Sequence, residues 1–332
     1  MRKFMFSLIL SILVLSITLT GYMAEEKLVW NEKWPTKIRI GAGQIGGGFY
    51  MGSSGFANAL KEEFPELEVI VEQTKASIHN IKLIEAKEVD FAMCTANIVY
   101  EAWNGIGNFE GKEYKSIRMV MLTWPDAKSW ATLKKSGITD VTQFTKMVSG
   151  FTKGSENDNF NHKVFETFGI KAEIVNISPS DSVESLKNGM IEGYIMGYPD
   201  PSTSELALTH DIRLIEITKE QAEYFLEKHP EYIYPVIIPG GYYKGVDEPV
   251  NTIGGYQLVM VRDDLPEDMV YAVLKAVFKH QEIVEQTWPI FGKSMKNIGD
   301  VKLLKFPFHK GAIRYYKEIG VELSEAATSL DE

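Results

Sequence analysis

The chain has 332 residues, of which 45% are hydrophobic, and its formal net charge at pH 7 is −10. This length favours two lobes over one, because single hydrophobic cores stop growing near about 250 to 300 residues. The acidic balance argues against nucleic acid and against an anionic membrane surface as partners. An anionic ligand is not excluded, since local backbone geometry can bind an anion on an acidic protein.

The first 24 residues have the pattern of an export signal. Two basic residues precede an uncharged run that ends at Ala24 and is rich in Leu, Ile and Val, as in a secretory leader. We expect cleavage after Gly21 or Ala24, although the run is also long enough to be retained as a membrane anchor. No cysteine follows it for a lipid anchor. We therefore predict that residues 1–24 are a signal peptide and that the mature protein is periplasmic.

The first half of the mature chain alternates strand and helix patterns. Its β-branched runs are short, and the helical patterns between them have short connections. This order predicts a mainly parallel sheet that is covered by helices on both faces. The expected elements are strands at 37–40, 67–73 and 90–94, helices at 50–64 and 78–86, and a further strand at 117–123.

The same alternation begins again after Trp124. In both halves a glycine and serine element stands where a strand passes into a helix, and Gly169 follows the first helix of the second half at a position suited to the left-handed conformation. We therefore predict two similar α/β lobes. The expected elements here are strands at 146–149, 174–177 and 191–196, and helices at 160–168 and 179–189.

A third stretch follows the second lobe. Residues 251–261 are apolar and strand-like, and residues 267–288 have helical spacing. This stretch can return to complete the sheet of the first lobe, in which case two hinge strands are expected near residues 122–128 and 232–238. Two lobes joined in this way can close on a ligand when a few residues bend. The predicted division is residues 37–122 plus 239–332 for lobe 1, and residues 123–238 for lobe 2.

The most informative motif is the glycine-rich turn before the helix at 50–64. Residues 41–46 match G-x-G-x-x-G after a strand, a pattern known from dinucleotide-binding domains. We reject a nicotinamide cofactor, because an exported protein meets no maintained NAD pool and an aromatic pair crowds the helix start. The consecutive glycines instead favour a turn whose backbone N–H groups bind a small anion. The alternative is a turn that is purely structural. The candidate ligand-binding residues of this turn are Gly47, Gly48, Phe49 and Tyr50.

Other candidate residues occur in two further turns and before two prolines. Ser77 and Asn80 are expected at a carboxylate site or as the N-cap and a first-turn residue of a helix, and the two roles are compatible. Glu156 either receives a ligand ammonium group, in which case it repels a dicarboxylate, or is a solvated loop charge. Trp124 and Tyr198 either wall the pocket or pack in the core. The candidates outside the glycine-rich turn are Ser77, Asn80, Trp124, Gly154, Ser155, Glu156, Asn157 and Tyr198.

Catalytic and metal-binding motifs are missing from the sequence. The histidines lack the spacing of a zinc site, and neither G-x-S-x-G nor H-E-x-x-H occurs. Cys94 is the single cysteine and lies in an apolar run, so we expect a buried strand residue. We predict no enzyme, no cofactor and no metal; an exported hydrolase is a distant alternative.

The order of the motifs resembles the solute-binding proteins of tripartite ATP-independent periplasmic (TRAP) transporters, in the subgroup called TAXI. The likeness covers nearly the whole mature chain, and its specificity lies in the order and spacing of the motifs. The sequence departs from the family pattern at Ala76, where glycine is usual, at His79, and after Ser155. The matching segments are the glycine-rich turn with its aromatic pair, residues 76–80, Gly154 with Ser155, residues 185–193, residues 238–242 and residues 306–320.

The resemblance implies a two-lobed α/β periplasmic-binding-protein fold with two hinge strands. It implies a receptor that closes around a small organic anion, either an amino acid such as glutamate or a keto or dicarboxylic acid. The receptor would deliver this ligand to a TRAP membrane permease driven by an ion gradient, and no catalysis is implied. A ligand-sensing receptor for a signalling partner would use the same pocket, so the sequence leaves both roles open.

Overall fold

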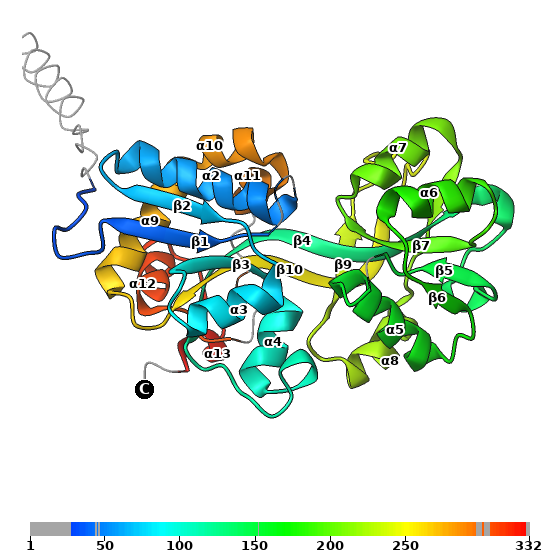
Figure 1. The fold of residues 1–332 in the computed structure, drawn as a ribbon, viewed down its shortest axis with the longest axis horizontal. Coiled ribbons are helices and arrows are strands. Elements are labelled where there is room, and N and C mark those ends of the chain that lie inside the picture. Colours follow the sequence, from blue (N-terminus) through cyan, green and yellow to red (C-terminus); the bar gives the residue numbers. More distant parts are fainter. Residues whose placement is uncertain are drawn as a thin grey trace, which may run out of the picture.

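In the computed structural model the described residues are 28–43, 45, 47–151, 153–296, 301 and 306–329. The predicted signal peptide lies outside this part of the chain, as do Gln44 and Gly46 of the glycine-rich turn. Figure 1 shows two lobes with long strands running between them. Within the described residues, every helix is too short or too polar to span a bilayer.

The first lobe contains a parallel sheet with the strand order β2-β1-β3. A helix follows each strand; the sequence pattern predicts the first two of these helices but not the third, at Ala96–Asn104. Strand β3 is buried along its whole length, because it lies between β1 and a long strand that arrives from the other lobe. The elements are β1 (Lys37–Gly41), α2 (Gly48–Glu63), β2 (Glu68–Glu72), α3 (Ser77–Glu85), β3 (Phe91–Thr95), α4 (Ala96–Asn104) and the short helix η1 (Gly107–Phe109).

The second lobe repeats this arrangement with parallel strands in the order β7-β5-β6. Its first helix ends at Gly169, which adopts the expected left-handed conformation with φ 66°. The elements are η2 (Lys134–Ser136), η3 (Val141–Gln143), β5 (Met147–Ser149), α5 (Glu156–Phe168), β6 (Glu173–Val175), α6 (Pro179–Lys187), β7 (Gly193–Tyr198), α7 (Pro201–Thr209), β8 (Ile212–Leu214), α8 (Lys219–Lys228) and β9 (Ile233–Ile238).

Two long antiparallel strands, β4 (Ile117–Leu133) and β10 (Val250–Arg262), connect the lobes (Figure 1). Strand β10 pairs with β3 at one end and with β9 at the other, while β4 reaches β7 and β8. One ten-stranded sheet therefore runs through both lobes. The expected hinge at 122–128 lies within β4. The second crossing strand is β10 and not the segment at 232–238, which pairs only with β10 among the described strands.

The C-terminal helices complete the first lobe. Buried side chains such as Val273 and Tyr316 pack in the same hydrophobic cluster as Ile40 and Phe91. Tyr243 and Val250 belong instead to a cluster of the second lobe, so the chain returns to the first lobe within β10 and not at residue 239. The helices of this part are α9 (Glu267–Lys279), α10 (Gln281–Thr287), α11 (Pro289–Ser294), α12 (Lys310–Glu318) and α13 (Glu325–Thr328).

The crossing strands approach each other closely at Gly254. A Cβ atom added there would lie 2.1 Å from the carbonyl oxygen of Asp126, whereas one added to Gly255 meets nothing within 4 Å. We expect Gly254→Ala to lower the free energy of unfolding by about 1 to 3 kcal/mol, because β4 must shift. Gly255→Ala is the matched control, with a change below about 1 kcal/mol. Urea denaturation measures both values, and equal stability of the two variants would contradict the close approach.

Candidate functional site

A cavity of about 380 Å³ lies where the lobes meet over the crossing strands. Its walls come from the glycine-rich turn and the start of α3 in the first lobe, and from the end of β7 and the start of α7 in the second. This volume falls within the usual range for small-molecule sites, and we call it the cleft cavity. Its lining residues are Gly43, Gly47, Gly48, Phe49, Ala76, Trp124, Asp126, Gly197, Tyr198, Pro199, Pro201, Gln257 and Trp288.

Two helices begin at the first-lobe wall without a side-chain cap. Gly47 precedes α2 and Ala76 precedes α3, and neither residue supplies a side-chain hydrogen bond to its helix. N–H groups of a first helical turn have no partner within the helix, and the helix dipole adds partial positive charge there. This wall can therefore bind an anionic group. The second-lobe helices α5, α6, α7 and α8 are capped by Ser155, Ser178, Asp200 and Thr218.

Aromatic rings form another side of the cleft cavity. The ring centroids of Trp124 and Trp288 lie 6.1 Å apart, those of Trp124 and Phe49 lie 6.3 Å apart, and both pairs meet edge to face. Gly48 lies against both tryptophan rings, and a Cβ atom there would make ordinary van der Waals contact, 3.4 Å from Trp288 and 3.5 Å from Trp124. The rings offer an apolar surface for the carbon skeleton of a ligand.

A buried lysine lies beside the second-lobe wall. Lys128 is 4% exposed; its Nζ lies 2.9 Å from Asp126 Oδ2, contacts the carboxylate of Glu156 and donates a hydrogen bond to Asn157 Oδ1 at 2.8 Å. Burial acts to lower the pKa of Lys128, but the two carboxylates outweigh burial and raise it. Burial also raises the pKa of Glu156 in spite of the lysine. Glu156 is thus not a solvated loop charge.

The same cluster connects the lobes. The amide of Asn97 in α4 donates to Glu156 Oε1 at 3.1 Å. Farther along the same two helices, Lys163 Nζ lies 3.0 Å from Glu101 and 2.8 Å from Glu231. Helix α4 belongs to the first lobe and α5 to the second, so these bonds hold the lobes together beside the cleft cavity.

Two buried polar atoms at the cleft cavity lack a hydrogen-bond partner within the described part of the chain. One is the side-chain oxygen of Gln257, a residue that is 7% exposed, and the other is Trp288 Nε1. Buried polar groups are nearly always hydrogen-bonded, and an unpaired one costs about 1 to 3 kcal/mol. Gln257 offers an acceptor and Trp288 a donor to a bound molecule.

Some of the predicted site residues line the cleft cavity and others do not. Glu156 and Asn157 do not line the cleft cavity; they contact Lys128, which forms an ion pair with the lining residue Asp126. Tyr50 is not among the described residues that line it, and Gly154 donates its N–H to Asp158 Oδ2 at 2.8 Å in the turn before α5. The predicted residues that line the cleft cavity are Gly47, Gly48, Phe49, Trp124 and Tyr198.

Three other predicted residues make internal hydrogen bonds. The buried amide of Asn80 donates to the carbonyl oxygens of Ala42 and Met93, at 2.7 Å each. Ser77 Oγ accepts the N–H of Thr95 at 3.2 Å, and the N-cap residue of α3 is Ala76 and not Ser77. Ser155 Oγ caps α5 by accepting the N–H of residue 158 at 3.2 Å.

Asp126, Lys128, Gln257 and Trp288 are site residues that the sequence analysis missed. Gln257 had a visible signal, since its amide interrupts the apolar residues at 256–261 within the strand segment at 251–261. The charged pair in β4 and the tryptophan between α10 and α11 had none, because only the tertiary fold brings them to the cleft cavity.

Residues 40–320 match the NMT1-like family. The chain belongs to this family. Among solved structures, a TctC solute-binding protein from Polaromonas has 14% identity and a TM-score of 0.50, over 86% of this chain and 98% of that chain. The periplasmic aliphatic sulphonate-binding protein SsuA from Escherichia coli has 15% identity and a TM-score of 0.49, over 89% of this chain and 97% of that chain. An ancestral arginine-binding protein has 12% identity and a TM-score of 0.47, over 77% of this chain and 98% of that chain.

The TctC structure confirms the predicted fold of this NMT1-like protein. The likeness to the TctC protein shows the two-lobed α/β architecture of periplasmic solute-binding proteins. The TctC protein and SsuA are solute-binding proteins.

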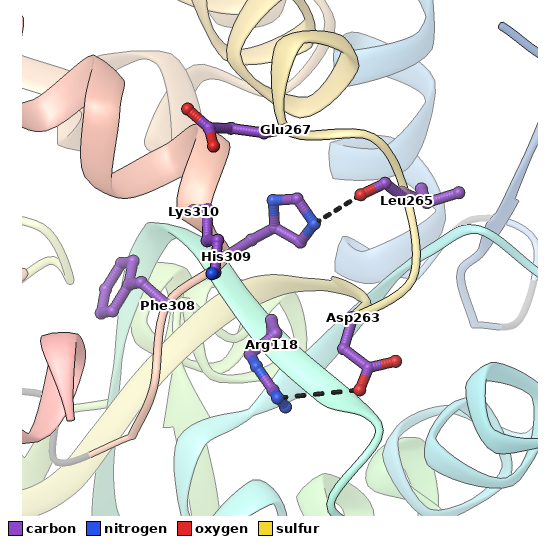
Figure 2. A pocket seen from close by; sticks show the side chains of 7 residues that line it. All are labelled: Arg118, Asp263, Leu265, Glu267, Phe308, His309 and Lys310. Atoms are coloured by element: carbon purple, nitrogen blue, oxygen red, sulfur yellow. Dashed lines mark hydrogen bonds and ion pairs between the residues drawn. The ribbon is translucent and has the colours of Figure 1, made fainter. Parts of the chain in front are cut away.

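A smaller hollow of about 140 Å³ lies at the end of β4 that is remote from the second lobe (Figure 2). His309 is 3% exposed there. Its Nε2–H donates to the carbonyl oxygen of Leu265 at 3.0 Å, and its Nδ1 accepts the N–H of Gly311 at 3.2 Å and caps α12. Burial lowers the pKa of His309. This histidine is therefore a structural residue that must stay neutral to keep both bonds.

The strained backbone at Ala76 gives a test of the first-lobe wall. Ala76 has φ 63° and ψ −152°, a region that is nearly restricted to glycine and costs other residues about 1 to 3 kcal/mol. We expect Ala76→Gly to raise the free energy of unfolding by about 1 kcal/mol, after the entropy cost of glycine. Ala86→Gly, at the other end of α3 with φ −77°, should instead lower it by up to about 1 kcal/mol. Thermal denaturation of both variants checks this opposite sign, and a destabilised Ala76→Gly variant would refute it.

His309 predicts a pH dependence of stability. The unfolded chain binds a proton near the usual pKa of 6.5, while the folded chain does so only at lower pH. The free energy of unfolding should therefore fall as the pH drops below about 6.5, with a slope of up to about 1.4 kcal/mol per pH unit from this group. His309→Asn keeps a capping acceptor without this titration. Urea denaturation between pH 5 and pH 8 compares the two proteins, and parallel curves would exclude His309 as the cause.

Proposed function

We propose that the protein is a periplasmic receptor that binds a small organic anion in the cleft cavity and delivers it to a membrane permease. The supporting observation is the composition of this cavity: both lobes line it, uncapped helix starts form one wall, and two of its lining residues, Gln257 and Trp288, carry buried polar atoms without a hydrogen-bond partner in the described chain. The leader pattern of residues 1–24 supports export.

The polar groups around the cleft cavity favour an amino acid among the small organic anions. Donors gather on the first-lobe side, where the starts of α2 and α3 and Trp288 Nε1 can bind a carboxylate. Acceptors lie over the crossing strands, where Asp126 and Gln257 can bind an ammonium group. A dicarboxylate would instead place its second charge near Asp126 and Glu156, which repel it.

The interlobe bonds support a receptor that distinguishes its bound from its empty state. Glu156 contacts Lys128 beside the cleft cavity and also accepts from Asn97 of the first lobe. A ligand that contacts both lobes binds the closed arrangement more tightly than the open one. This difference in affinity sets how far the ligand shifts the equilibrium toward the closed arrangement. The permease can then recognise the closed receptor. The motif order shared with TAXI proteins supports a TRAP permease as the partner.

A thermal-shift screen of residues 25–332 against amino acids, keto acids and dicarboxylates tests this function. Ligand at a hundredfold its dissociation constant should stabilise the protein by about 2.7 kcal/mol. We expect amino acids to raise the melting temperature more than dicarboxylates do. A protein that none of these compounds stabilises would contradict the proposal.

Replacement of Gln257 tests the site itself. We expect Gln257→Leu to weaken ligand binding by about tenfold or more, because a hydrogen bond to the ligand is lost. Without ligand, the variant should be as stable as the wild type or more stable, since an unpaired buried amide has been removed. Isothermal titration calorimetry and thermal denaturation give the two readings.

Ser178→Ala is the control for Gln257→Leu. Ser178 caps α6 and does not line the cleft cavity, so its loss should cost about 1 kcal/mol of stability and leave the affinity unchanged. Wild-type affinity in Gln257→Leu would remove Gln257 from the site.

A further inference from the structure

The lining of the cleft cavity is mostly uncharged and largely aromatic. Among its described residues, Asp126 is the only one with a charged side chain, and Gln257 is the only one with an amide. Every other lining residue is aromatic, proline, glycine or alanine. A bound molecule therefore meets one carboxylate, one amide and a broad apolar surface. Such a surface is complementary to an apolar part of the ligand.

The polar side chains of the lining lie on the crossing strands. Asp126 belongs to β4 and Gln257 to β10. A Cβ atom added to Gly197 of β7 would lie 3.2 Å from Asp126 Oδ1, so this carboxylate lies against the second-lobe wall. The side-chain oxygen of Gln257 is buried and has no partner in the described chain. Two acceptors on one floor suit an ammonium group that donates N–H bonds.

The aromatic rings lie beside the helix start that we assign to the ligand carboxylate. A Cβ atom added to Gly48, the first residue of α2, would contact the rings of both Trp124 and Trp288. Phe49 follows in the same turn, and its Cβ would lie 3.1 Å from one added to Gly43. In an α-amino acid the ammonium group and the side chain branch from the carbon next to the carboxylate. With the carboxylate at α2 and the ammonium group over the crossing strands, the side chain lies among the rings.

A charged side chain on the ligand would have no partner of its own among the described lining residues. Lys128 lies next to the lining, but Asp126, Glu156 and Asn157 already contact its ammonium group. A second carboxylate on the ligand would therefore be buried without a cation, which is costly. A second ammonium group would have to share Asp126 with Lys128 and with the first ammonium group.

We propose that the natural ligand is a neutral α-amino acid with a large apolar side chain, of the size of leucine, methionine or phenylalanine. Its carboxylate lies at the starts of α2 and α3, and its ammonium group lies at Asp126 and Gln257. Its side chain packs against Phe49, Trp124 and Trp288. This inference rests on the proposed function and narrows its ligand class from small organic anions to one kind of amino acid.

Amino acids of matched shape test the inference by calorimetric titration of the wild type. Methionine, glutamine and glutamate have side chains of similar length, and leucine, asparagine and aspartate form a branched set. We expect methionine to bind more tightly than glutamate, and leucine more tightly than aspartate, by about tenfold or more, because an unpaired carboxylate resists burial. Affinity should rise from alanine to methionine by up to about fourfold for each methylene-sized group that becomes buried.

Variants separate the ring wall from the polar floor. Phe49→Ala should lower the affinity for methionine by about fourfold to fifteenfold, the equivalent of one to two buried methylene groups, and leave the affinity for alanine unchanged. Tyr50→Ala is the matched control and should change neither affinity, because Tyr50 is the next residue of α2 and is also half-buried but does not line the cleft cavity. Gln257→Leu should weaken the binding of methionine and alanine alike.

Each further result counts for or against the inference. Tighter binding of glutamate or lysine than of methionine would overturn it and leave the proposed function intact. The same holds for equal binding of alanine and methionine with no effect of Phe49→Ala, which would make the rings core packing only. Binding of keto acids or dicarboxylates alone would overturn the inference but keep a receptor for organic anions. Failure of every amino acid and organic acid to bind would overturn both.

Discussion

The pairing of β4 with β10 is the constraint on which the site depends. These strands carry the sheet from one lobe into the other, and their approach at Gly254 brings the backbone of β10 against the carbonyl group of Asp126. Side chains two positions apart on a strand point to the same face. Trp124, Asp126 and Lys128 therefore lie in a row on one face of β4. Gln257 lies on the partner strand. The floor of the cleft cavity, with its ring, its carboxylate and its amide, is therefore fixed by one strand pair.

The charges of the cleft cavity are divided between the lobes. Lys128 is the buried cation nearest to it, yet Asp126, Glu156 and Asn157 all bind its ammonium group. The lysine therefore neutralises part of an acidic cluster and is poorly suited to bind an anion itself. Positive potential comes instead from the helix starts in the first lobe. A ligand with both charges, oriented with its carboxylate toward the first lobe, complements this arrangement better than a ligand with negative charge alone.

The sequence predicted the parts of the fold that have local signals. Alternating strands and helices, the glycine-rich turn and the position of Trp124 before a proline all follow from neighbouring residues. The second crossing strand was misplaced, because the apolar segment at 251–261 is compatible with any buried strand and only its pairing with β3, β4 and β9 defines its role. Asn80 and Ser77 show a second limit: the residue types that bind a carboxylate also tie backbone loops together, and here their hydrogen bonds are internal.

Glu156 connects ligand binding to lobe closure in the proposed receptor. Its carboxylate is shared between Lys128 of β4 and Asn97 of α4, and Asp126 holds the other side of the same lysine. An ammonium group of the ligand at Asp126 competes with Lys128 for the Asp126 carboxylate. The ion pair between Lys128 and Glu156 then becomes stronger. Asn97 of α4 can donate its hydrogen bond to Glu156 of α5 only when these two helices are close together. Occupancy of the cleft cavity and contact between the lobes therefore draw on one group of charges, which gives the permease a physical difference to recognise.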